Sequence, residues 1–400
     1  MGGGVVSVLV GLAGASLLAW IGLLVGRGFF WWPSPRLEPP GSDAEACERS
    51  VVAVIPARNE AEVLPETLPT VLSQDSPGRF RAVLVDDRSG DGTAAAARSA
   101  AEEASAEDRL VVIPGEPLPV GWAGKVWAMH QGVRASAVAL GAPELPDFLW
   151  FTDADVAHEP WVLHALISRA EAGGLDLVST MATLRVDSGW DRLLVPAFVY
   201  FFAKLYPFRF VNRCHRRDAG AAGGCILVRR STFERAGGLA AIRSALIDDC
   251  ALGRLIKRSG GRIWLGFSTG VRSVRGYGSL SSVWEMVARS AYTQLRRSPL
   301  ILTATILGMS FLYALPPIAC VGGAVATAFG LSGALVAAVL GGAAWGLMAA
   351  SFVPILRHHG VGPWTAPLLP VAGVLYSAMT LSSAWRHTKG RGGGWKGRTY

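Results

Sequence analysis

Two long stretches that are nearly free of charge set the strongest limit on what this chain can fold into. Residues 1–26 carry no charged side chain, and residues 301–385 carry only Arg357. The chain's 38 basic and 30 acidic residues therefore lie almost entirely outside these two blocks. About 20 consecutive apolar residues cross a bilayer, so both blocks predict membrane helices flanking a polar domain. The pattern excludes a disordered chain, a collagen-like chain and a freely soluble globule.

The first apolar block predicts a retained membrane anchor over residues 1–32. Its uncharged run at 5–25 is long enough to cross a bilayer. Arg27 and the aromatic residues at 29–32 follow it, as at a membrane interface. A cleaved signal peptide is the alternative, but the run has no basic leader and no clear cleavage site. A neutral start followed by Arg27 predicts that the next domain lies in the cytoplasm.

Most of the net charge of +8 lies beside the apolar blocks. The tail 386–400 alone has five basic residues and no acidic one. A nucleic-acid-binding protein would carry its excess positive charge on the folded domain, so no nucleic-acid partner is expected. The tail instead predicts a topology signal or contact with anionic lipid.

The five cysteines are odd in number, widely spaced and without a CxxC pair. They predict neither a disulfide framework nor a zinc site. A reduced, cytoplasmic environment for the polar block fits this usage best.

After a linker at 33–50, strand-like and helix-like segments alternate along the polar block. This alternation predicts an α/β fold with a mostly parallel sheet covered by helices on both faces. In such sheets the ligand crevice lies beyond the carboxyl ends of the strands. The expected strands are 51–55 (ended by Pro56), 81–85, 110–113, 148–152 and 175–183, and the expected helices are 63–72, 93–107, 125–139 and 161–172.

Acidic side chains follow two of the predicted strands. Asp153 and Asp155 come directly after the strand at 148–152 and can offer hard oxygen ligands to Mg²⁺ or Mn²⁺, which can also hold a diphosphate. A solvated turn is the alternative, but the presence of acidic residues at the ends of other predicted strands favours a metal site. Asp86 and Asp87 end the strand at 81–85 and can accept hydrogen bonds from a base or ribose.

Three further side chains are candidates because each stands at a helix start. Lys125 fails the Walker pattern but can meet a phosphate or a sugar hydroxyl, with plain helix capping as the equal alternative. Asp248 and Asp249 are adjacent carboxylates that repel each other, so one pKa is expected to rise, as a general base requires. The alternative is that both only complement the helix dipole.

The polar block closes on a basic helix end just before the second apolar block. Gln294 and Arg297 lie three residues apart there and can face one ligand together. Anchoring to lipid head groups is the other interpretation.

Taken in order, these motifs resemble the family-2 glycosyltransferases of GT-A fold. Within that family the similarity is closest to the membrane-bound, hopanoid-associated glycosyltransferases, which are related to ceramide and carotenoid glucosyltransferases. It runs over 51–298, and the ordered set is specific although no single motif is strong. The motifs are Ile-Pro-Ala-Arg-Asn-Glu60, Val-Asp-Asp87, Thr-Asp-Ala-Asp155, Asp-Asp249 followed by Leu252, and Gln294-x-x-Arg297.

The resemblance implies a role for each matching residue. Asp249 matches the catalytic base, with Asp248 where the family usually has Glu. Gln294 and Arg297 match the motif for the diphosphate and acceptor, but Ser298 replaces the usual Trp, which puts an aromatic acceptor platform in doubt. Pro56, Ala57, Glu60 and Asp87 would line the base and ribose, Asp153 would touch the ribose or donor sugar, Asp155 would hold the metal, and Gly223 and Gly224 would allow close approach near the donor sugar.

The activity implied by the resemblance is an inverting, metal-dependent transfer of a sugar from a nucleotide-sugar donor, favoured as a UDP-sugar, to the hydroxyl of a lipid such as a hopanoid or another isoprenoid. It further implies a multi-pass protein of the inner (plasma) membrane with the catalytic domain, 51–298, in the cytoplasm. Two alternatives stay open. One is a processive polysaccharide synthase, and the other is a catalytically silent membrane scaffold of the same fold.

Two segments leave the membrane arrangement open. Residues 190–217 interleave aromatic and basic side chains, which fits either a core helix with a basic loop or, as favoured here, an interfacial segment. The membrane region 299–385 offers three apolar runs, at 301–328, 331–356 and 363–385. Three crossings from a cytoplasmic start would leave the basic tail outside, against the positive-inside tendency. Either one run is re-entrant or interfacial, or the first is split at its adjacent prolines.

Overall fold

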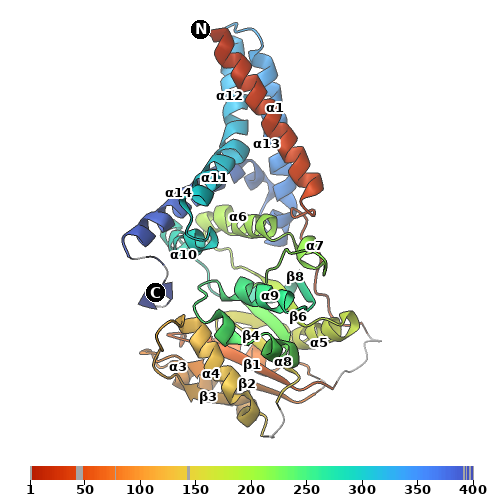
Figure 1. Cartoon of the computed structure of the whole chain (residues 1–400), viewed down its shortest axis with the longest axis vertical. Helices are drawn as coiled ribbons and strands as arrows, with labels where there is room; N and C mark the ends of the chain where they lie inside the picture. Colours follow the sequence, from red (N-terminus) through yellow and green to blue (C-terminus); the bar gives the residue numbers. More distant parts are fainter. Residues whose placement is uncertain are drawn as a thin grey trace. The chain divides into compact units, whose positions relative to one another are not determined.

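A computed structural model of the chain describes two compact units (Figure 1). The apolar unit comprises Met1–Pro33, Val186–Pro207 and Tyr277–Gly393, and the α/β unit comprises Ser34–Arg185, Phe208–Gly276 and Gly394–Tyr400. The apolar unit thus takes in two helical segments that lie within 51–298, because their buried faces pack on the apolar helices. The described residues are 2–41, 48–76, 78–141, 145–390, 392, 394–395 and 398–399, so parts of the predicted linker and of the basic tail lie outside them.

The α/β unit is built on an eight-stranded sheet of order β3-β2-β1-β4-β7-β6-β8-β5. Its first four strands run parallel to one another, and β6 is parallel to β8. Only β7 and β5 run antiparallel to their neighbours. The predicted α/β class with a mostly parallel sheet is therefore confirmed. The strands are β1 (Val51–Ala57), β2 (Phe80–Asp86), β3 (Leu110–Pro114), β4 (Phe148–Thr152), β5 (Val156–His158), β6 (Leu177–Thr183), β7 (Cys225–Arg229) and β8 (Ile263–Ser273).

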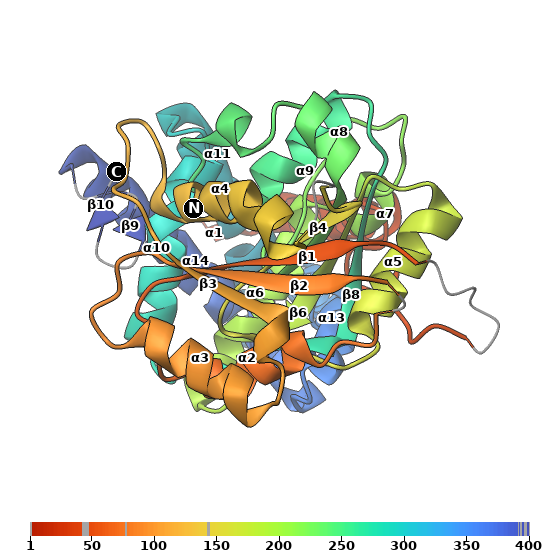
Figure 2. The same ribbon diagram turned by 90° about the horizontal axis from the view of Figure 1, so that it is seen from below.

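Helices cover both faces of the parallel half of the sheet. Figure 2 shows α2 and α3 on one face of β1, β2 and β3 and α4 on the other. A side chain at Gly132 of α4 would come within 2.5 Å of the Val54 side chain, so glycine lets this helix lie directly on β1. The helices are α2 (Leu64–Leu72), α3 (Thr93–Glu103), α4 (Gly124–Ala139), α5 (Val162–Gly173), α7 (Phe208–Val211), α8 (Arg230–Arg235) and α9 (Asp248–Arg258), with short 3₁₀ turns at Glu107–Arg109 and Leu239–Ile242.

Two predicted boundaries were wrong. The first strand does not end before Pro56 but continues through it to Ala57, paired with β2. Its other neighbour, β4, pairs only as far as Val54, so Pro56 has a strand on one side only, where proline is tolerated. The helix predicted at 93–107 stops at Glu103, and a separate 3₁₀ turn leads into β3.

The apolar unit contains helices of the length and composition that membrane spans require. Among the described residues five segments satisfy this test, namely Gly4–Gly26, Gly189–Val211 (whose last four residues belong to the α/β unit), Pro299–Ala328, Ala334–His358 and Pro363–Thr388. Its elements are α1 (Gly2–Gly26), α6 (Gly189–Leu205), α10 (Leu280–Gln294), α11 (Pro299–Met309), the π-helical segment η3 (Ser310–Ala314), α12 (Leu315–Ala328), α13 (Ala334–His358), the 3₁₀ segment η4 (Pro363–Leu368) and α14 (Leu369–Thr388).

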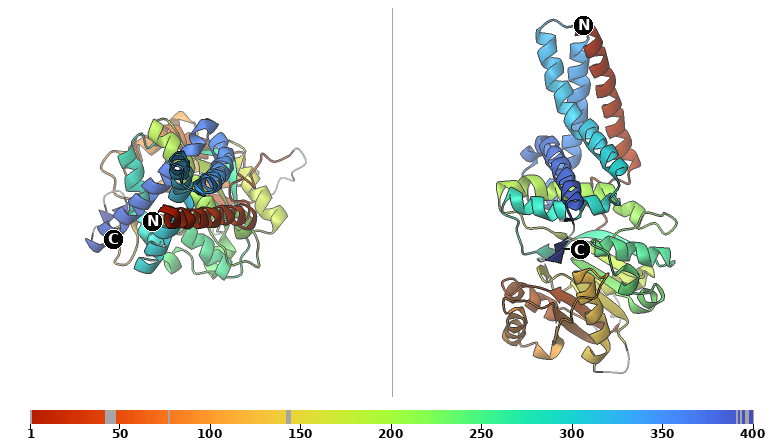
Figure 3. Two further views of the ribbon diagram at one scale, coloured as in Figure 1. Left: turned by 90° about the horizontal axis from the view of Figure 1, so that it is seen from above. Right: turned by 60° about the vertical axis from the view of Figure 1, so that its left-hand side comes forward.

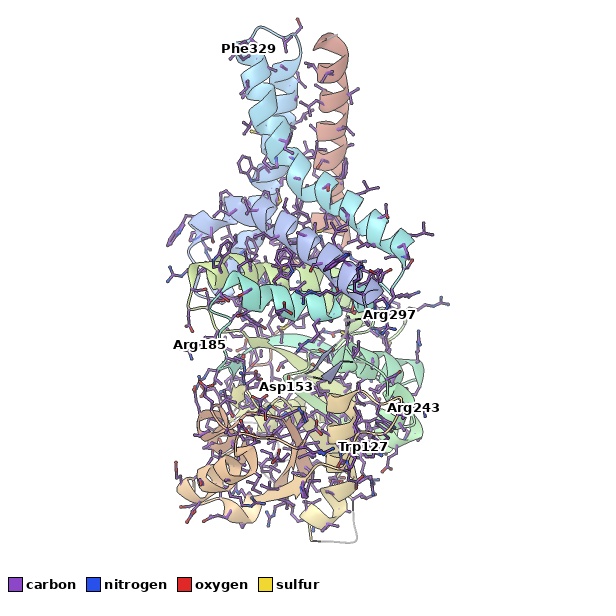
Figure 4. All side chains as sticks on the ribbon, turned by 90° about the vertical axis from the view of Figure 1, so that its left-hand side faces the viewer. Trp127, Asp153, Arg185, Arg243, Arg297 and Phe329 are labelled. Carbon is purple, nitrogen blue, oxygen red and sulfur yellow. The ribbon has the colours of Figure 1, made fainter. Side chains whose placement is uncertain are left out.

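Helices α1, α12 and α13 lie side by side in this unit (Figure 3). Small residues allow the closest approach: a side chain at Gly323 would come within 2.5 Å of the Ala338 nitrogen, and one at Gly341 within 2.6 Å of the Cys320 nitrogen. Close contact through glycine is typical of helices that pack in a bilayer, where no hydrophobic effect drives them together. The outer surfaces remain apolar, as Phe329 at the end of α12 illustrates with 81% exposure (Figure 4).

Helix α1 supplies hydrogen-bond donors at the point where the regular hydrogen bonding of α11, η3 and α12 is interrupted. Pro316 and Pro317 cannot donate backbone hydrogen bonds, and the Leu315 N–H is diverted to Ser310 in the π-helical turn. The freed carbonyls of Phe311 and Leu312 accept instead from the Ser16 hydroxyl at 3.1 Å and from the Trp20 indole at 2.8 Å. Helix α1 is therefore an integral part of this unit.

The segment 190–217 divides between the two units. Helix α6 begins with a capping box between Ser188 and Asp191 and is largely buried in the apolar unit. Its Tyr200 hydroxyl bonds to Ser351 at 2.6 Å. The short helix α7 and the basic loop after it belong to the α/β unit. This is the geometry of the core-helix alternative, while the favoured interfacial role stays a prediction.

Candidate active site

Lys125 is the centre of a charged cluster beyond the carboxyl end of β4. As the second residue of α4, it places its Nζ 2.7 Å from Asp153 Oδ1 and 3.2 Å from Asp248 Oδ2. Burial by itself lowers the pKa of Lys125, but the neighbouring carboxylates, including Asp249, raise it further than burial lowers it. The lysine therefore stays charged, and it holds Asp153 of the turn after β4 together with Asp248 at the start of α9. Since the α4 start has no side-chain cap, Lys125 binds carboxylates rather than capping the helix.

Asp249, the second residue of α9, is held by two backbone donors. The Gly223 N–H donates to its Oδ2 at 2.9 Å, and the Cys250 N–H donates to its Oδ1 at 2.6 Å. Burial raises the pKa of Asp249 to about 6, and the adjacent Asp248 adds to the rise while Lys125 opposes it. A fixed carboxylate that titrates close to neutral pH is suited to act as a general base.

Gly223 brings the backbone close to this cluster. A side chain there would lie 3.4 Å from Asp249 Oδ2 and 3.6 Å from Lys125 Nζ. Gly224, predicted beside the donor sugar, packs on Val156 and Ala182, and its carbonyl accepts from Thr152. Of the two glycines, Gly223 therefore lines the charged cluster directly. Its role as a backbone donor could not be predicted from the sequence, because it depends on the fold of the loop.

Asp153 and Asp155 lie in the turn between β4 and β5, with side chains 32% and 28% exposed (Figure 4 labels Asp153). Burial raises the pKa of Asp153 to about 6, and Lys125 opposes this rise. No group of three or more His, Cys, Asp or Glu residues that could hold a metal occurs in the described part of the chain. Two carboxylates nevertheless suit Mg²⁺ or Mn²⁺ when substrate phosphates complete the coordination. The residues present therefore fit such an ion together with a diphosphate.

Arg275 is a member of the site that was not predicted. Beyond the end of β8, its guanidinium pairs with Glu60 and lies 3.3 Å from Asp155 Oδ2. The Val274 N–H next to it donates to the Asp155 carbonyl at 2.9 Å, which ties this segment to the acidic turn. One cation thus connects a predicted nucleotide residue with a predicted metal ligand. The sequence offered little signal for it, because a single arginine follows the strand without a motif.

The other predicted nucleotide residues gather at the ends of β1 and β2. Pro56 and Ala57 pair with Val85 and Asp86 at the last positions of the two strands. Asp86 accepts from the Ser89 N–H at 3.0 Å. Glu60 and Asp87 are both buried, and Arg58 donates to the Asp87 carbonyl at 2.6 Å. The predicted convergence of these residues at the strand ends is therefore what the structure shows.

Gln294 and Arg297 belong to the apolar unit. Gln294 ends α10 and donates to the Tyr206 hydroxyl at 2.7 Å. Arg297, labelled in Figure 4, is exposed and has a positive φ of 55° in the turn that leads into α11. Ser298 caps that helix, with its hydroxyl accepting from the Ile301 N–H. Ser298 therefore has a structural role at the start of this helix.

Comparison with known proteins finds similarity over much of the α/β unit. Residues 52–237 match the family model of glycosyl transferase family 2. An undecaprenyl-phosphate 4-deoxy-4-formamido-L-arabinose transferase of Pseudomonas paraeruginosa is 32% identical over 191 residues, which are 46% of this chain and 48% of the relative. The corresponding transferase of Pseudomonas savastanoi pv. phaseolicola is 28% identical over 182 residues, 44% of this chain and 46% of that protein. The chain spans about half the length of the curated relatives it matches.

One solved structure resembles the whole chain. A mannosyltransferase from Pyrobaculum calidifontis, in complex with GDP-Man and Mn²⁺, matches with a TM-score of 0.50 and 17% sequence identity. The match covers 95% of this chain and 99% of that one. This likeness confirms the GT-A-like fold with accompanying helices.

Proposed function

We propose that this chain is a membrane-bound glycosyltransferase that moves a sugar from a nucleotide-sugar donor to a hydroxyl group of a lipid, with inversion at the anomeric carbon. The observation that carries the proposal is the cluster in which Lys125 joins Asp153 to Asp248 beside the backbone-held Asp249. The family-2 domain supports it, as does the likeness in fold to a mannosyltransferase that binds GDP-Man and Mn²⁺.

The donor would bind along the carboxyl ends of β1, β2 and β4. The buried carboxylates Glu60 and Asp87, with Asp86 beside them, would accept hydrogen bonds from the base and ribose. Asp153 and Asp155 would hold Mg²⁺ or Mn²⁺, which when bound neutralises charge on the diphosphate. The remaining residues proposed to contact the donor are Pro56, Ala57, Lys125, Gly224, Gln294 and Arg297.

Asp249 would act as the base in a single displacement. It takes the proton of the acceptor hydroxyl while that oxygen forms a bond to the anomeric carbon and the bond to the diphosphate oxygen breaks. Two N–H donors fix its carboxylate, so the group is oriented before the reaction. Asp248 is paired with Lys125 and is proposed to support the site rather than to take the proton.

The acceptor would be a lipid, because the described part of the chain offers five helices long and apolar enough to span a membrane. The matched relatives are undecaprenyl-phosphate sugar transferases, which supports a lipid-linked acceptor. A hopanoid or other isoprenoid alcohol is the proposed class. An inner-membrane location with the catalytic domain in the cytoplasm completes the proposal.

Membranes containing the full chain would test this function when incubated with a panel of labelled nucleotide sugars, with and without Mn²⁺. We expect Mn²⁺-dependent label in the lipid extract, with a mass that identifies one added sugar. Label in a long polymer would instead support the polysaccharide-synthase alternative. The absence of transfer and of donor hydrolysis for every donor would support the silent-scaffold alternative. Asp108→Asn, at an exposed carboxylate outside the site, is the matched control for variants of the site.

A further inference from the structure

Lys204 is a cation without an acidic partner on an apolar helix. It lies near the end of α6, and its Nζ donates to the Tyr313 hydroxyl at 2.6 Å. The same Nζ lies 4.5 Å from the centre of the Tyr313 ring and 5.3 Å from that of Phe201. Among the described residues no carboxylate comes within ion-pair distance of it. A charged residue within a membrane segment is costly unless it is paired, so it marks a candidate functional site.

A second cation lies at the same end of α6. Arg27, which follows α1, donates to the carbonyls of Lys204 and Leu205 at 3.1 and 3.2 Å. A helix C-terminus carries only about half a negative charge, so it offsets only part of the positive charge that Arg27 and Lys204 can carry. The end of α6 therefore keeps net positive charge.

Residues from three segments of the apolar unit meet around this helix end. Tyr313 belongs to the π-helical segment η3, a type of irregularity that occurs often at functional sites. Tyr206, the residue that ends α6, accepts from Gln294 of α10 at 2.7 Å. We call Arg27, Lys204 and Tyr313 the α6-end cluster. Tyr313 is fully buried, and its hydroxyl oxygen accepts from Lys204 and fixes the position of the Lys204 Nζ.

The apolar unit has little negative charge with which to balance this cluster. Its segments contain ten basic and three acidic residues, a net charge of +7 out of the chain's +8. Of the acidic residues, Glu285 pairs with Arg386, and Asp191 serves the start of α6. The unit therefore supplies few acidic side chains, and no described carboxylate forms an ion pair with Lys204.

Apolar surface borders the two cations. Val25 is 69% exposed, Trp32 52%, Leu205 48% and Phe29 41%, and all four lie within five residues of Arg27 or Lys204 along the chain. An anion that also carries apolar chains would satisfy both surfaces at once. A soluble anion would leave these apolar side chains uncovered.

We propose that the α6-end cluster binds the phosphate group of an anionic lipid. Lys204 and Arg27 supply the positive charge, the buried Tyr313 hydroxyl holds the Lys204 Nζ in position, and the lipid chains cover the neighbouring apolar side chains. A phosphate ester is favoured because lysine and arginine are its usual partners and its oxygens can accept several donors at once. The binding does not depend on the proposed transfer reaction.

The test uses the full chain purified in a non-ionic detergent. Dioctanoyl phosphatidic acid, dioctanoylglycerol and inorganic phosphate are each titrated, and affinity is read from the shift in melting temperature. We expect tight binding of phosphatidic acid only. Lys204→Met should weaken it roughly ten- to hundredfold, and Lys204→Arg much less, since only the latter retains the charge. Lys389→Met, at an exposed lysine of the same unit, is the matched control and should bind as the unchanged chain does.

Three results would overturn the proposal. Lys204→Met could melt normally and bind phosphatidic acid with unchanged affinity. Dioctanoylglycerol could bind equally tightly, which would show that the phosphate is not recognised. Inorganic phosphate could bind equally tightly, which would show a free-anion site. If Lys204→Met does not fold, Arg27→Gln gives a second reading, with weaker binding of phosphatidic acid expected and unchanged binding contradictory. Sugar transfer is measured separately, so failure of either proposal is recognisable by itself.

Discussion

Two lysines, one in each unit, are treated in opposite ways. Lys125 in the α/β unit pairs with two carboxylates and lies close to a third. Lys204 in the apolar unit instead contacts the hydroxyl and ring of Tyr313 and the ring of Phe201. The first charge is balanced within the fold and organises an acidic site. The second has no carboxylate beside it among the described residues. A lysine side chain can therefore be neutralised within the fold or stay able to bind an anion, depending on which charged groups lie beside it.

The largest expected effect concerns the acid held next to Lys125. Asp249→Asn should lower the transfer rate by about 10² to 10⁴-fold, because the amide cannot take the acceptor proton. Donor affinity should stay nearly unchanged, since Asn retains the shape of the side chain. Steady-state kinetics and a donor titration read the two quantities. Turnover at the normal rate would remove Asp249 from its proposed role.

The next prediction compares the two lysines directly. Lys125→Met should destabilise the protein by about 1–3 kcal/mol, because partly buried carboxylates lose their shared counter-charge. Lys204→Met should be neutral or stabilising, since it removes an unpaired charge from apolar surroundings. Denaturant unfolding of both variants gives the two changes in free energy. Equal destabilisation would show that Lys204 is balanced within the fold after all.

The pH dependence of transfer sharpens the assignment of the base. The pKa of Asp249 is raised to about 6, and only the ionised carboxylate can accept a proton. The rate should therefore be level above pH 6 and fall about tenfold for each pH unit below it. A pH–rate profile of kcat/KM measures this. A rate that stays flat down to pH 4 would point to a different base.

The smallest effect is expected at Arg275. Its guanidinium competes with a cation for Asp155, so Arg275→Ala should tighten binding of Mn²⁺ in the absence of donor by a few fold. Arg272→Ala, at an exposed arginine on β8 that pairs with Glu66, is the matched control. Electron paramagnetic resonance reads free Mn²⁺ directly. Weaker binding in Arg275→Ala would mean that the arginine supports the metal site instead of competing with it.

The sequence predicted the parallel half of the sheet and the acidic strand ends well, because apolar periodicity and strand-end carboxylates are local signals. It did not predict Arg275 or the Gly223 donor, since their positions depend on contacts between residues far apart in the chain. The hydrogen bonds from Ser16 and Trp20 to the interrupted helix could not be predicted for the same reason. The end of the first strand was predicted too early, at Pro56. Whether a strand can continue through a proline depends on which neighbouring strands pair with it at that position.

The central claim is that Asp249 drives one direct displacement at the anomeric carbon. The most direct test is the anomeric configuration of the lipid product formed by the purified full chain, read from the coupling constant of the anomeric proton. An α-linked nucleotide sugar should give a β-linked product. An α-linked product would contradict the account, because retention requires a second displacement or front-face attack.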